Sequence, residues 1–136
     1  MKTVVITGVD RGLGYASLSV YLAKGYHVIG TCHSATHELH QELMASFGEQ
    51  LHLITVDIGD DDSVRRAVQQ IYGLTDQVDL LINNAGVLGD ITQGIYDESL
   101  DYKMMLQVMN VNALGPLRVT HGLWDLLLLG EDRVVV

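Results

Sequence analysis

The sequence predicts an α/β fold, in which helices cover both faces of a doubly wound parallel sheet. Short aliphatic and β-branched runs alternate with segments of helical periodicity, and these runs lie at 3–7, 27–32, 51–57 and 78–82. Hydrophobic residues make up 48% of the chain and aromatic residues only 6%, which suits aliphatic strands buried under helices. Alternating strands and helices indicate parallel strands joined by right-handed crossovers. We expect one domain over residues 1–136, with a fifth strand beginning at 133–136.

The first helix is predicted over 13–23, between the first two strands. Its apolar residues recur at spacings of three and four and should face the sheet. They are Leu13, Ala16, Val20 and Ala23. A cation followed by a glycine, Lys24 and Gly25, marks the end of this helix.

Two further helices are predicted before the fourth strand. The second covers 36–47 and stops at Gly48, with an apolar stripe of Leu39, Leu43 and Phe47. The third begins at capping residues within 60–63. Its core-facing residues are Val64, Ala67, Val68 and Ile71.

The last third of the chain is expected to contain a loop over 86–98 and a long helix over 99–129, interrupted at Pro116. Proline lacks an N–H group, so it cannot bond the carbonyl four residues earlier, at Asn112. The end of the helix is apolar on several sides, which predicts burial of this segment. Its residues are Leu123, Trp124, Leu126, Leu127 and Leu128.

Charge and cysteine content restrict the possible partners and the compartment. The formal net charge of −9 argues against binding to nucleic acid or to an anionic membrane. The single cysteine, Cys32, fits a reducing cytosol. The apolar run at 3–7 is too short for a signal peptide, and no run reaches membrane-spanning length. We expect a soluble, cytoplasmic protein.

The turn after the first strand carries three glycines, at 8, 12 and 14, and leads directly into a helix. A helix N-terminus offers unpaired N–H groups and a positive dipole end to an anion, and glycine allows the anion to approach the backbone closely. Parallel sheets bind ligands beyond the carboxyl ends of their strands, where the glycine and asparagine signals lie. The turn therefore indicates a dinucleotide site on a Rossmann-type sheet.

Four motifs in order resemble the short-chain dehydrogenase/reductase family. The T-G-x-x-x-G-x-G turn is Thr7, Gly8, Gly12 and Gly14, and the acidic end of the third strand is Asp57 with Ile58. The N-N-A-G after the fourth strand is 83–86, and the N-x-x-G of the long helix is 112–115. The run at 114–120 resembles the carbonyl-reductase-like branch. The resemblance implies hydride transfer between a nicotinamide cofactor and a small-molecule carbonyl or alcohol.

The resemblance also assigns roles to single residues. Asn112 falls on the family's catalytic asparagine, whose backbone holds a water in a proton relay. The expected cofactor-binding residues are Thr7, Gly8, Asp10, Arg11, Gly12, Leu13, Gly14, His33, Asp57, Ile58, Asn84, Ala85 and Gly86. At the N-N-A-G, Asn83 and Asn84 can bond neighbouring backbone where the strands diverge, and Gly86 lets the chain pass close to a ribose. Purely structural alternatives remain open: the N-N-A-G as turn formers that close a strand, Asp57 as a solvated strand end or a helix cap, and Pro116 as a kink that only bends the helix.

Cofactor choice is expected to depend on the end of the second strand. Family members that prefer NAD place an acid where this chain has Cys32, and members that prefer NADP often place an arginine at the position of His33. The NADP-preferring members also often carry a basic residue before the second glycine, at the position of Arg11. A 2′-phosphate favours cations and is repelled by a carboxylate. We expect NADP(H) rather than NAD, with His33 as a weaker, pH-dependent helper; the alternative for Arg11 is a plain surface charge.

The family's catalytic Ser and Tyr-x-x-x-Lys are not found in these 136 residues, since none of the six tyrosines has a lysine four residues later. We therefore expect the N-terminal half of a reductase. The alternatives are a fragment that binds nucleotide without turnover and one that exists mainly as an assembly. The resemblance implies a homodimer or homotetramer formed through helix 99–129; otherwise this helix would be covered by the rest of the same chain.

Three histidines, His33, His37 and His40, have spacings that suit metal ligands on a helix face. No cysteine or carboxylate completes a convincing set. We expect surface histidines and no metal.

Overall fold

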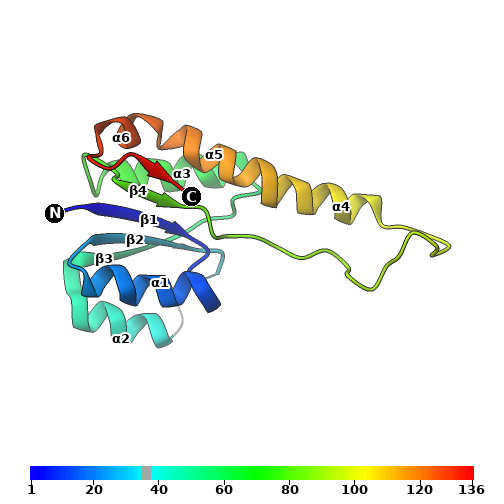
Figure 1. Ribbon diagram of the computed structural model, residues 1–136, viewed down its shortest axis with the longest axis horizontal. Helices are drawn as coiled ribbons and strands as arrows, with labels where there is room; N and C mark the ends of the chain where they lie inside the picture. The colour runs from blue at the N-terminus through cyan, green and yellow to red at the C-terminus, as the bar shows by residue number, and fades with distance from the viewer. Residues whose placement is uncertain (35–37) are drawn as a thin grey trace.

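The computed structural model describes residues 1–34 and 38–136. In it five parallel strands form one sheet in the order β3-β2-β1-β4-β5 (Figure 1). The strands are β1 (Thr3–Thr7), β2 (His27–Cys32), β3 (Leu51–Thr55), β4 (Leu80–Ile82) and β5 (Val134–Val135). The predicted α/β fold with a doubly wound parallel sheet is confirmed.

Helices cover both faces of this sheet. On one face lie α1 (Gly12–Ala23) and α2 (Glu38–Phe47), and on the other lie α3 (Asp61–Tyr72), α5 (Gly115–Gly122) and α6 (Trp124–Leu129) (Figure 1). A short 3-10 turn, η1 (Gly48–Gln50), links α2 to β3. The strand order reverses between β1 and β4, which makes their carboxyl ends the topological switch point of the sheet.

The core has two parts, one on each face of the sheet. Alternate residues of β1 point to opposite faces, so that Val5 packs toward α3, α5 and α6 while Val4 and Ile6 pack toward α1. The first part includes Ile71 and Leu123, and the second includes Leu18 and Leu22. Both faces of the central strands are buried, which explains their continuous aliphatic sequence.

The prediction for the buried face of α1 is wrong. Gly14, Leu18 and Leu22 are buried in this helix, whereas Leu13 is 77% exposed and Val20 50% exposed. Ala16 and Ala23 are exposed as well. The helix carries small or apolar residues all around, so its sequence contains no polar face that would indicate its orientation.

The next two helices agree better with expectation. The Asp60 side chain accepts a hydrogen bond from the Ser63 N–H and caps α3, whose buried residues are Val64, Ala67 and Ile71. Leu43 and Phe47 of α2 pack against the core. The predicted start of this helix at 36–37, and the side chain of Leu39, lie outside the described residues.

The long helix is interrupted twice, and the first interruption precedes Pro116. Helix α4 (Tyr102–Met109), capped by Asp101, runs into a π-helical turn, η2 (Asn110–Leu114), in which the Gly115 N–H bonds the Asn110 carbonyl. Pro116 sits in the first turn of α5, where its missing N–H costs little. The second break is at Leu123, before α6. Burial of the apolar end is confirmed for Leu123, Leu126 and Leu127 only, since Trp124 and Leu128 are half exposed.

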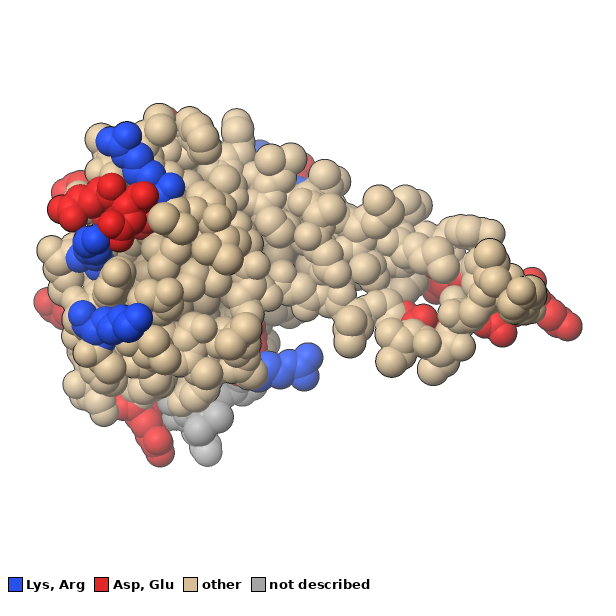
Figure 2. Space-filling view, viewed as in Figure 1, with Lys and Arg blue, Asp and Glu red and all other residues tan. Residues whose placement is uncertain are grey.

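Two strands are shorter than predicted: β3 ends at Thr55 and β4 begins at Leu80. The irregular segment after β4 and helix α4 extend away from the body as an arm, residues 88–109 (Figure 1). In the view of Figure 2 the arm carries mainly uncharged side chains, with acidic residues near its tip. No helix in the described part of the chain is both long and apolar enough to cross a membrane.

Candidate cofactor site

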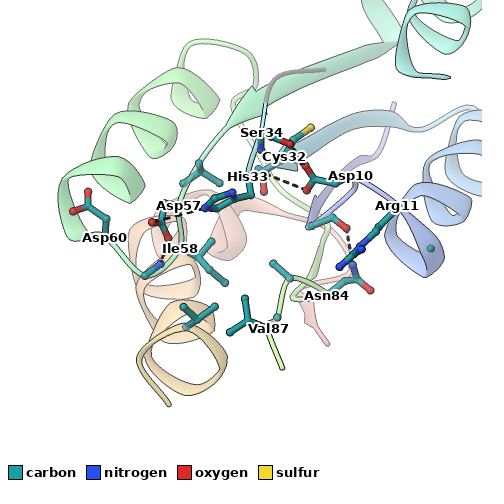
Figure 3. A pocket seen from close by; sticks show the side chains of 18 of the residues that line it. Asp10, Arg11, Cys32, His33, Ser34, Asp57, Ile58, Asp60, Asn84 and Val87 are labelled. Carbon is teal, nitrogen blue, oxygen red and sulfur yellow. Dashed lines mark hydrogen bonds and ion pairs between the residues drawn. The ribbon is translucent and has the colours of Figure 1, made fainter. Parts of the chain in front are cut away.

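A pocket of about 930 Å³ opens at the carboxyl ends of the strands, at the switch point between β1 and β4 (Figure 3). It is lined by the β1–α1 turn, by the ends of β2 and β3, by residues 84–87 after β4, and by one side of the π-helical turn. The lining includes eleven of the predicted site residues: Gly8, Asp10, Arg11, Gly12, Leu13, His33, Asp57, Ile58, Asn84, Ala85 and Gly86. Thr7, Gly14 and Asn112 do not line it and instead support residues that do.

The three glycines of the turn have different roles. Gly8 and Gly12 have φ of +70° and +59°, a region that favours glycine. A Cβ at Gly14 would lie 2.1 Å from the Gly8 carbonyl oxygen, so this glycine lets α1 pack closely on β1. A Cβ at Gly12 would meet nothing within 4 Å, because Gly12 faces open space in the pocket.

The N-terminus of α1 is left open at this point. Its N-cap residue, Arg11, makes no side-chain capping bond, and its first turn holds no acidic residue. The N-termini of α3 and α4, in contrast, are capped by Asp60 and Asp101. The free N–H groups and positive dipole end of α1 therefore face the pocket, where an anion can bind them.

Thr7 and Asn84 fasten the turn to the segment after β4. The Thr7 hydroxyl accepts hydrogen bonds from the N–H groups of Asn84 and Ala85, both at 3.0 Å. Asn84 Nδ2 donates to the carbonyls of Thr7 at 3.0 Å and of Gly8 at 2.9 Å. Asn84 therefore bonds neighbouring backbone as expected, whereas Asn83 Nδ2 donates to a side chain, the Thr120 hydroxyl, at 3.4 Å.

Asn112 fixes the next residue of the same segment. Its Oδ1 accepts a hydrogen bond from the Val87 N–H, and its Nδ2 donates to the Val87 carbonyl, both at 2.8 Å. A Cβ on Gly86 would lie 3.2 Å from the same Oδ1. Asn112 therefore acts through the main chain of residues 86–87, beside the pocket.

Asp57 and His33 lie next to each other on one wall of the pocket (Figure 3). Asp57 Oδ1 accepts a hydrogen bond from the Gly59 N–H at 2.8 Å, and its Oδ2 lies 4.0 Å from His33 Nε2. Both side chains are more than half exposed, so the pair is weak even when His33 is protonated. Asp57 caps no helix, because the cap of α3 is Asp60.

Asp10 contacts the segment that follows β2. Its Oδ2 accepts from the His33 N–H at 3.1 Å, and its Oδ1 from the N–H and the hydroxyl of Ser34, both at 3.3 Å (Figure 3). Desolvation acts to raise the pKa of Asp10, but the hydrogen bonds from His33 and Ser34 outweigh it and hold this pKa below its usual value. Asp10 is therefore a carboxylate at neutral pH.

Arg11 is exposed beside this carboxylate and makes no ion pair among residues 1–34 and 38–136. Cys32, at the end of β2, is 2% exposed. Burial and, to a lesser degree, the charge of Asp10 raise the pKa of its thiol to about 11. Arg11 and Cys32 thus supply a free cation and an unreactive, neutral wall.

Sequence reasoning missed the support that the π-helical turn gives to the β3–α3 loop. Asn110 Nδ2 donates to the Gly59 carbonyl at 2.8 Å, and Arg118 donates to Asn110 Oδ1 at 2.7 Å and pairs with Asp61. Both side chains tie helix to loop, and Asn110 also lines the pocket. The only signal was a second asparagine two residues before Asn112, which no local rule distinguishes from a surface residue.

The expectation of surface histidines is wrong for His40. This residue is 1% exposed, and its Nε2 lies 2.9 Å from the Val9 carbonyl oxygen, beneath the glycine turn. His33 is exposed as expected, and His37 lies outside the described residues. Within the described part of the chain, no three His, Cys, Asp or Glu side chains are placed to hold a metal ion.

Comparison with known proteins agrees with the fold and the position of the pocket. The family model of the short chain dehydrogenases matches residues 2–136. The chain belongs to the short-chain dehydrogenase family. This family of oxidoreductases uses NAD(P), and its members bind the cofactor at the switch point that the pocket occupies here.

Two curated relatives show how much of a family member is present. Dehydrogenase/reductase SDR family member 9 of Bos taurus is 32% identical over 98% of this chain, which covers 41% of that protein. Serine 3-dehydrogenase of Agrobacterium fabrum is 31% identical over 98% of this chain, which covers 51% of that protein. The chain thus spans about half the length, or less, of these two relatives.

Solved structures of similar proteins also match this chain over about half of their own length. A carbonyl reductase from Pseudomonas aeruginosa PAO1 in complex with NADP matches with a TM-score of 0.82 and 28% identity, covering 93% of this chain and 56% of that one. An NADPH-bound carbonyl reductase from chicken fatty liver matches with a TM-score of 0.79 and 28% identity, covering 93% and 52%. The sheet and its helices are therefore those of the N-terminal portion of such enzymes.

Proposed function

We propose that this chain is the cofactor-binding part of an oxidoreductase that transfers a hydride between NADP(H) and a small-molecule carbonyl or alcohol. The observation that carries the proposal is the uncapped N-terminus of α1, which opens with Gly12 into a pocket of about 930 Å³. This arrangement offers donors and a positive dipole end to a pyrophosphate, and the pocket volume suits a dinucleotide. When bound, the nicotinamide would supply or accept the hydride.

The remaining lining residues fit the other parts of the cofactor. Asp57 and Ile58, in the loop after β3, would bound the adenine, and the segment 84–86 would lie against the nicotinamide ribose. Asn112 holds this segment through Val87, with both polar atoms of its amide engaged. Any direct part of Asn112 in proton transfer therefore belongs to its backbone.

Preference for the phosphorylated cofactor is supported by Arg11, the N-cap residue of α1, and by His33, which follows β2. Arg11 is exposed and unpaired in the described structure, and His33 lies beside it on the pocket wall. Two structural neighbours also carry the phosphorylated cofactor: the Pseudomonas reductase was solved with NADP and the chicken reductase with NADPH. A guanidinium is well suited to a 2′-phosphate.

The test is a titration of the full encoded chain with NADPH and with NADH. We expect tighter binding of NADPH, and a loss of about tenfold in its affinity in Arg11→Ala, equivalent to one charge-assisted contact. Arg66→Ala, which removes an exposed arginine from α3 away from the pocket, is the matched control and should change neither affinity. Equal or tighter NADH binding, or no effect of Arg11→Ala, would overturn the preference.

A second candidate is nucleotide binding without turnover. It concerns the 136 residues alone, in which no tyrosine precedes a lysine by four residues. Reading the coding sequence beyond Val136 separates the two: a Ser followed by Tyr-x-x-x-Lys supports hydride transfer, and a stop codon supports binding alone. Oxidation of NADPH in the presence of a panel of aldehydes and ketones then tests turnover directly.

Assembly into a homodimer or homotetramer through residues 99–129 is also proposed. Large apolar side chains are exposed along this segment, among them Leu106, Met109 and Leu117, each more than 60% exposed. Light scattering of wild type and Leu117→Arg tests the interface, with a shift toward monomer expected in the variant. We also propose a cytoplasmic location, in keeping with a single buried cysteine, and cell fractionation tests it.

A further inference from the structure

Two consecutive backbone N–H groups and one hydroxyl, all from the segment after β2, converge on a single carboxylate. The carboxylate is that of Asp10, and its three donors are the His33 N–H, the Ser34 N–H and the Ser34 hydroxyl, at 3.1 to 3.3 Å. Successive N–H groups of this kind form a concave site for an anion. Here the chain fills the site with its own anion.

This site lies where a doubly wound fold distinguishes the two dinucleotides. The end of the second strand reads the ribose 2′ position, by an acid for a hydroxyl or by a cation for a phosphate. Cys32 occupies this end and is buried and neutral, so it does neither. Asp10, His33 and Ser34 all line the pocket at the same wall.

We propose that Asp10 is a specificity-determining residue, whose carboxylate occupies the donors of residues 33–34 and opposes the entry of a 2′-phosphate. The inference rests on the proposed cofactor site. If Asp10 acts in this way, Arg11 and His33 favour NADP(H) while Asp10 disfavours it, and the balance between these residues sets the cofactor preference. An unphosphorylated ribose meets no such opposition, because its 2′-hydroxyl donates to a carboxylate.

The charges around the site make this opposition substantial. Asp57 places a second carboxylate on the wall, with its Oδ2 4.0 Å from His33 Nε2. Arg11 is the adjacent cation, and it is exposed. A phosphate entering here would therefore meet two carboxylates, and would have to take donors that Asp10 already holds.

The decisive experiment measures the dissociation constants of NADPH and NADH for Asp10→Asn in the full encoded chain. The amide keeps one acceptor for the N–H groups of the segment and removes the charge. We expect NADPH to bind about tenfold tighter than to wild type, equivalent to 1.4 kcal/mol, and NADH to change less than about twofold. Asp10→Glu keeps the charge and should bind NADPH no tighter than wild type does.

Asp76→Asn is the matched control. It removes one exposed carboxylate at the amino end of β4, on the opposite edge of the sheet, and should leave both constants unchanged. Unchanged binding of both cofactors in Asp10→Asn, or a parallel loss of both, would overturn the inference and leave Asp10 as a clamp on the loop. If the amide variant does not fold, Asp10→Ser provides the same comparison.

The outcome is separable from that of the proposed cofactor preference. The preference stands or falls on wild type and Arg11→Ala, whatever Asp10→Asn does. The inference about Asp10 depends only on the change in the ratio of the two constants between wild type and the amide variant. A wild type that prefers NADH would contradict the first and still allow the second.

Discussion

Asn112 holds the main chain of Val87 by both atoms of its side-chain amide, accepting from the N–H and donating to the carbonyl at 2.8 Å each. The contact joins the π-helical turn to the segment after β4, two parts of the chain that are 25 residues apart. Because Val87 lines the pocket, the amide positions the pocket wall without lining it.

Replacing Asn112 with alanine should therefore weaken cofactor binding while the protein remains folded. Loss of two hydrogen bonds of about 1 kcal/mol each predicts an increase of up to about thirtyfold in the Kd for NADPH. Asn112→Asp accepts a hydrogen bond but cannot donate one, so its Kd for NADPH should lie between those of wild type and Asn112→Ala. Gln70→Ala, on the exposed side of α3, serves as control. An unchanged Kd in Asn112→Ala would show that Val87 holds its place unaided.

The glycines of the turn should differ in what their substitution costs. In Gly14→Ala the new Cβ would lie 2.1 Å from the Gly8 carbonyl oxygen and 2.5 Å from Asn84 Nδ2, so α1 must move off β1. We expect a loss of roughly 3 kcal/mol in the free energy of unfolding, within the range for overpacking, measured by urea denaturation.

Gly12→Ala should cost only about 1 kcal/mol for its left-handed φ, yet abolish most NADPH binding, because the methyl group enters the open space of the pocket. Gly25→Ala is the matched control, because Gly25 also has a left-handed φ, +77°, and an added Cβ there would have nothing within 4 Å. Gly25 follows the C-terminal end of α1, away from the pocket. This variant should bind NADPH like wild type. Equal binding losses in the two variants would refute the pocket explanation.

These glycines also show what the sequence reveals and what it conceals. The strand–turn–helix pattern and the cap at Asp60 depend on neighbouring residues, so local reasoning finds them. The buried face of α1 could not be found in this way, because its opposite face is also apolar. The sequence predicts the helix break at Pro116, but the helix changes earlier, in the π-helical turn that ends before Gly115. Gly115 packs so closely on Ile58 that a Cβ on Gly115 would lie 2.7 Å from Ile58 Cδ1.

The site shows the same division. Motifs located eleven of the residues that line the pocket, because family motifs mark the strand ends. They placed Asp10 at the cofactor site but could not show its contacts, because its partners His33 and Ser34 are 23 and 24 residues away. Asn110 was missed for the same reason, since its partner Gly59 is 51 residues away. Contacts of this length follow from the fold and not from any local pattern.

At the amino end of β4, on the side of the sheet away from the pocket, the buried Asp79 carboxylate should stabilise the fold in a pH-dependent way. It accepts hydrogen bonds from the N–H groups of Thr3 and Glu131, both at 2.7 Å. Desolvation acts to raise the pKa of Asp79, but these bonds, with those of Gln77 and the charge of Lys2, hold the pKa below its usual value of 3.8.

Asp79→Asn leaves one of the N–H groups facing a donor, and should lower the free energy of unfolding by about 2 kcal/mol at pH 7. A depressed folded-state pKa means that the contribution is complete above the unfolded pKa and is lost as the pH falls through the folded value. The gap between wild type and variant in urea denaturation should therefore narrow below about pH 4. A gap that does not depend on pH would contradict an ionised Asp79.

Cys32 should react slowly in the folded protein. With a pKa of about 11, roughly a thousandth of the thiol is ionised at pH 8, against about a tenth at the ordinary pKa of 9.0. Alkylation by iodoacetamide should be at least about 100-fold slower than in urea. Asp10→Asn should speed it, because the Asp10 charge contributes to the raised pKa of Cys32. Equal rates in Asp10→Asn and wild type would exclude that contribution.

The most direct test of the cofactor site is hydrogen exchange of the backbone amides with and without saturating NADPH. Binding at the carboxyl ends of the strands predicts protection of the β1–α1 turn at 8–14, the end of β2 at 31–34, and the segments 57–60 and 84–87. The exchange rates of segments 75–79 and 130–133, which lie near the amino ends of β4 and β5, should not change. Protection confined to these amino-end segments, or no protection at saturating NADPH, would contradict a dinucleotide site at the switch point.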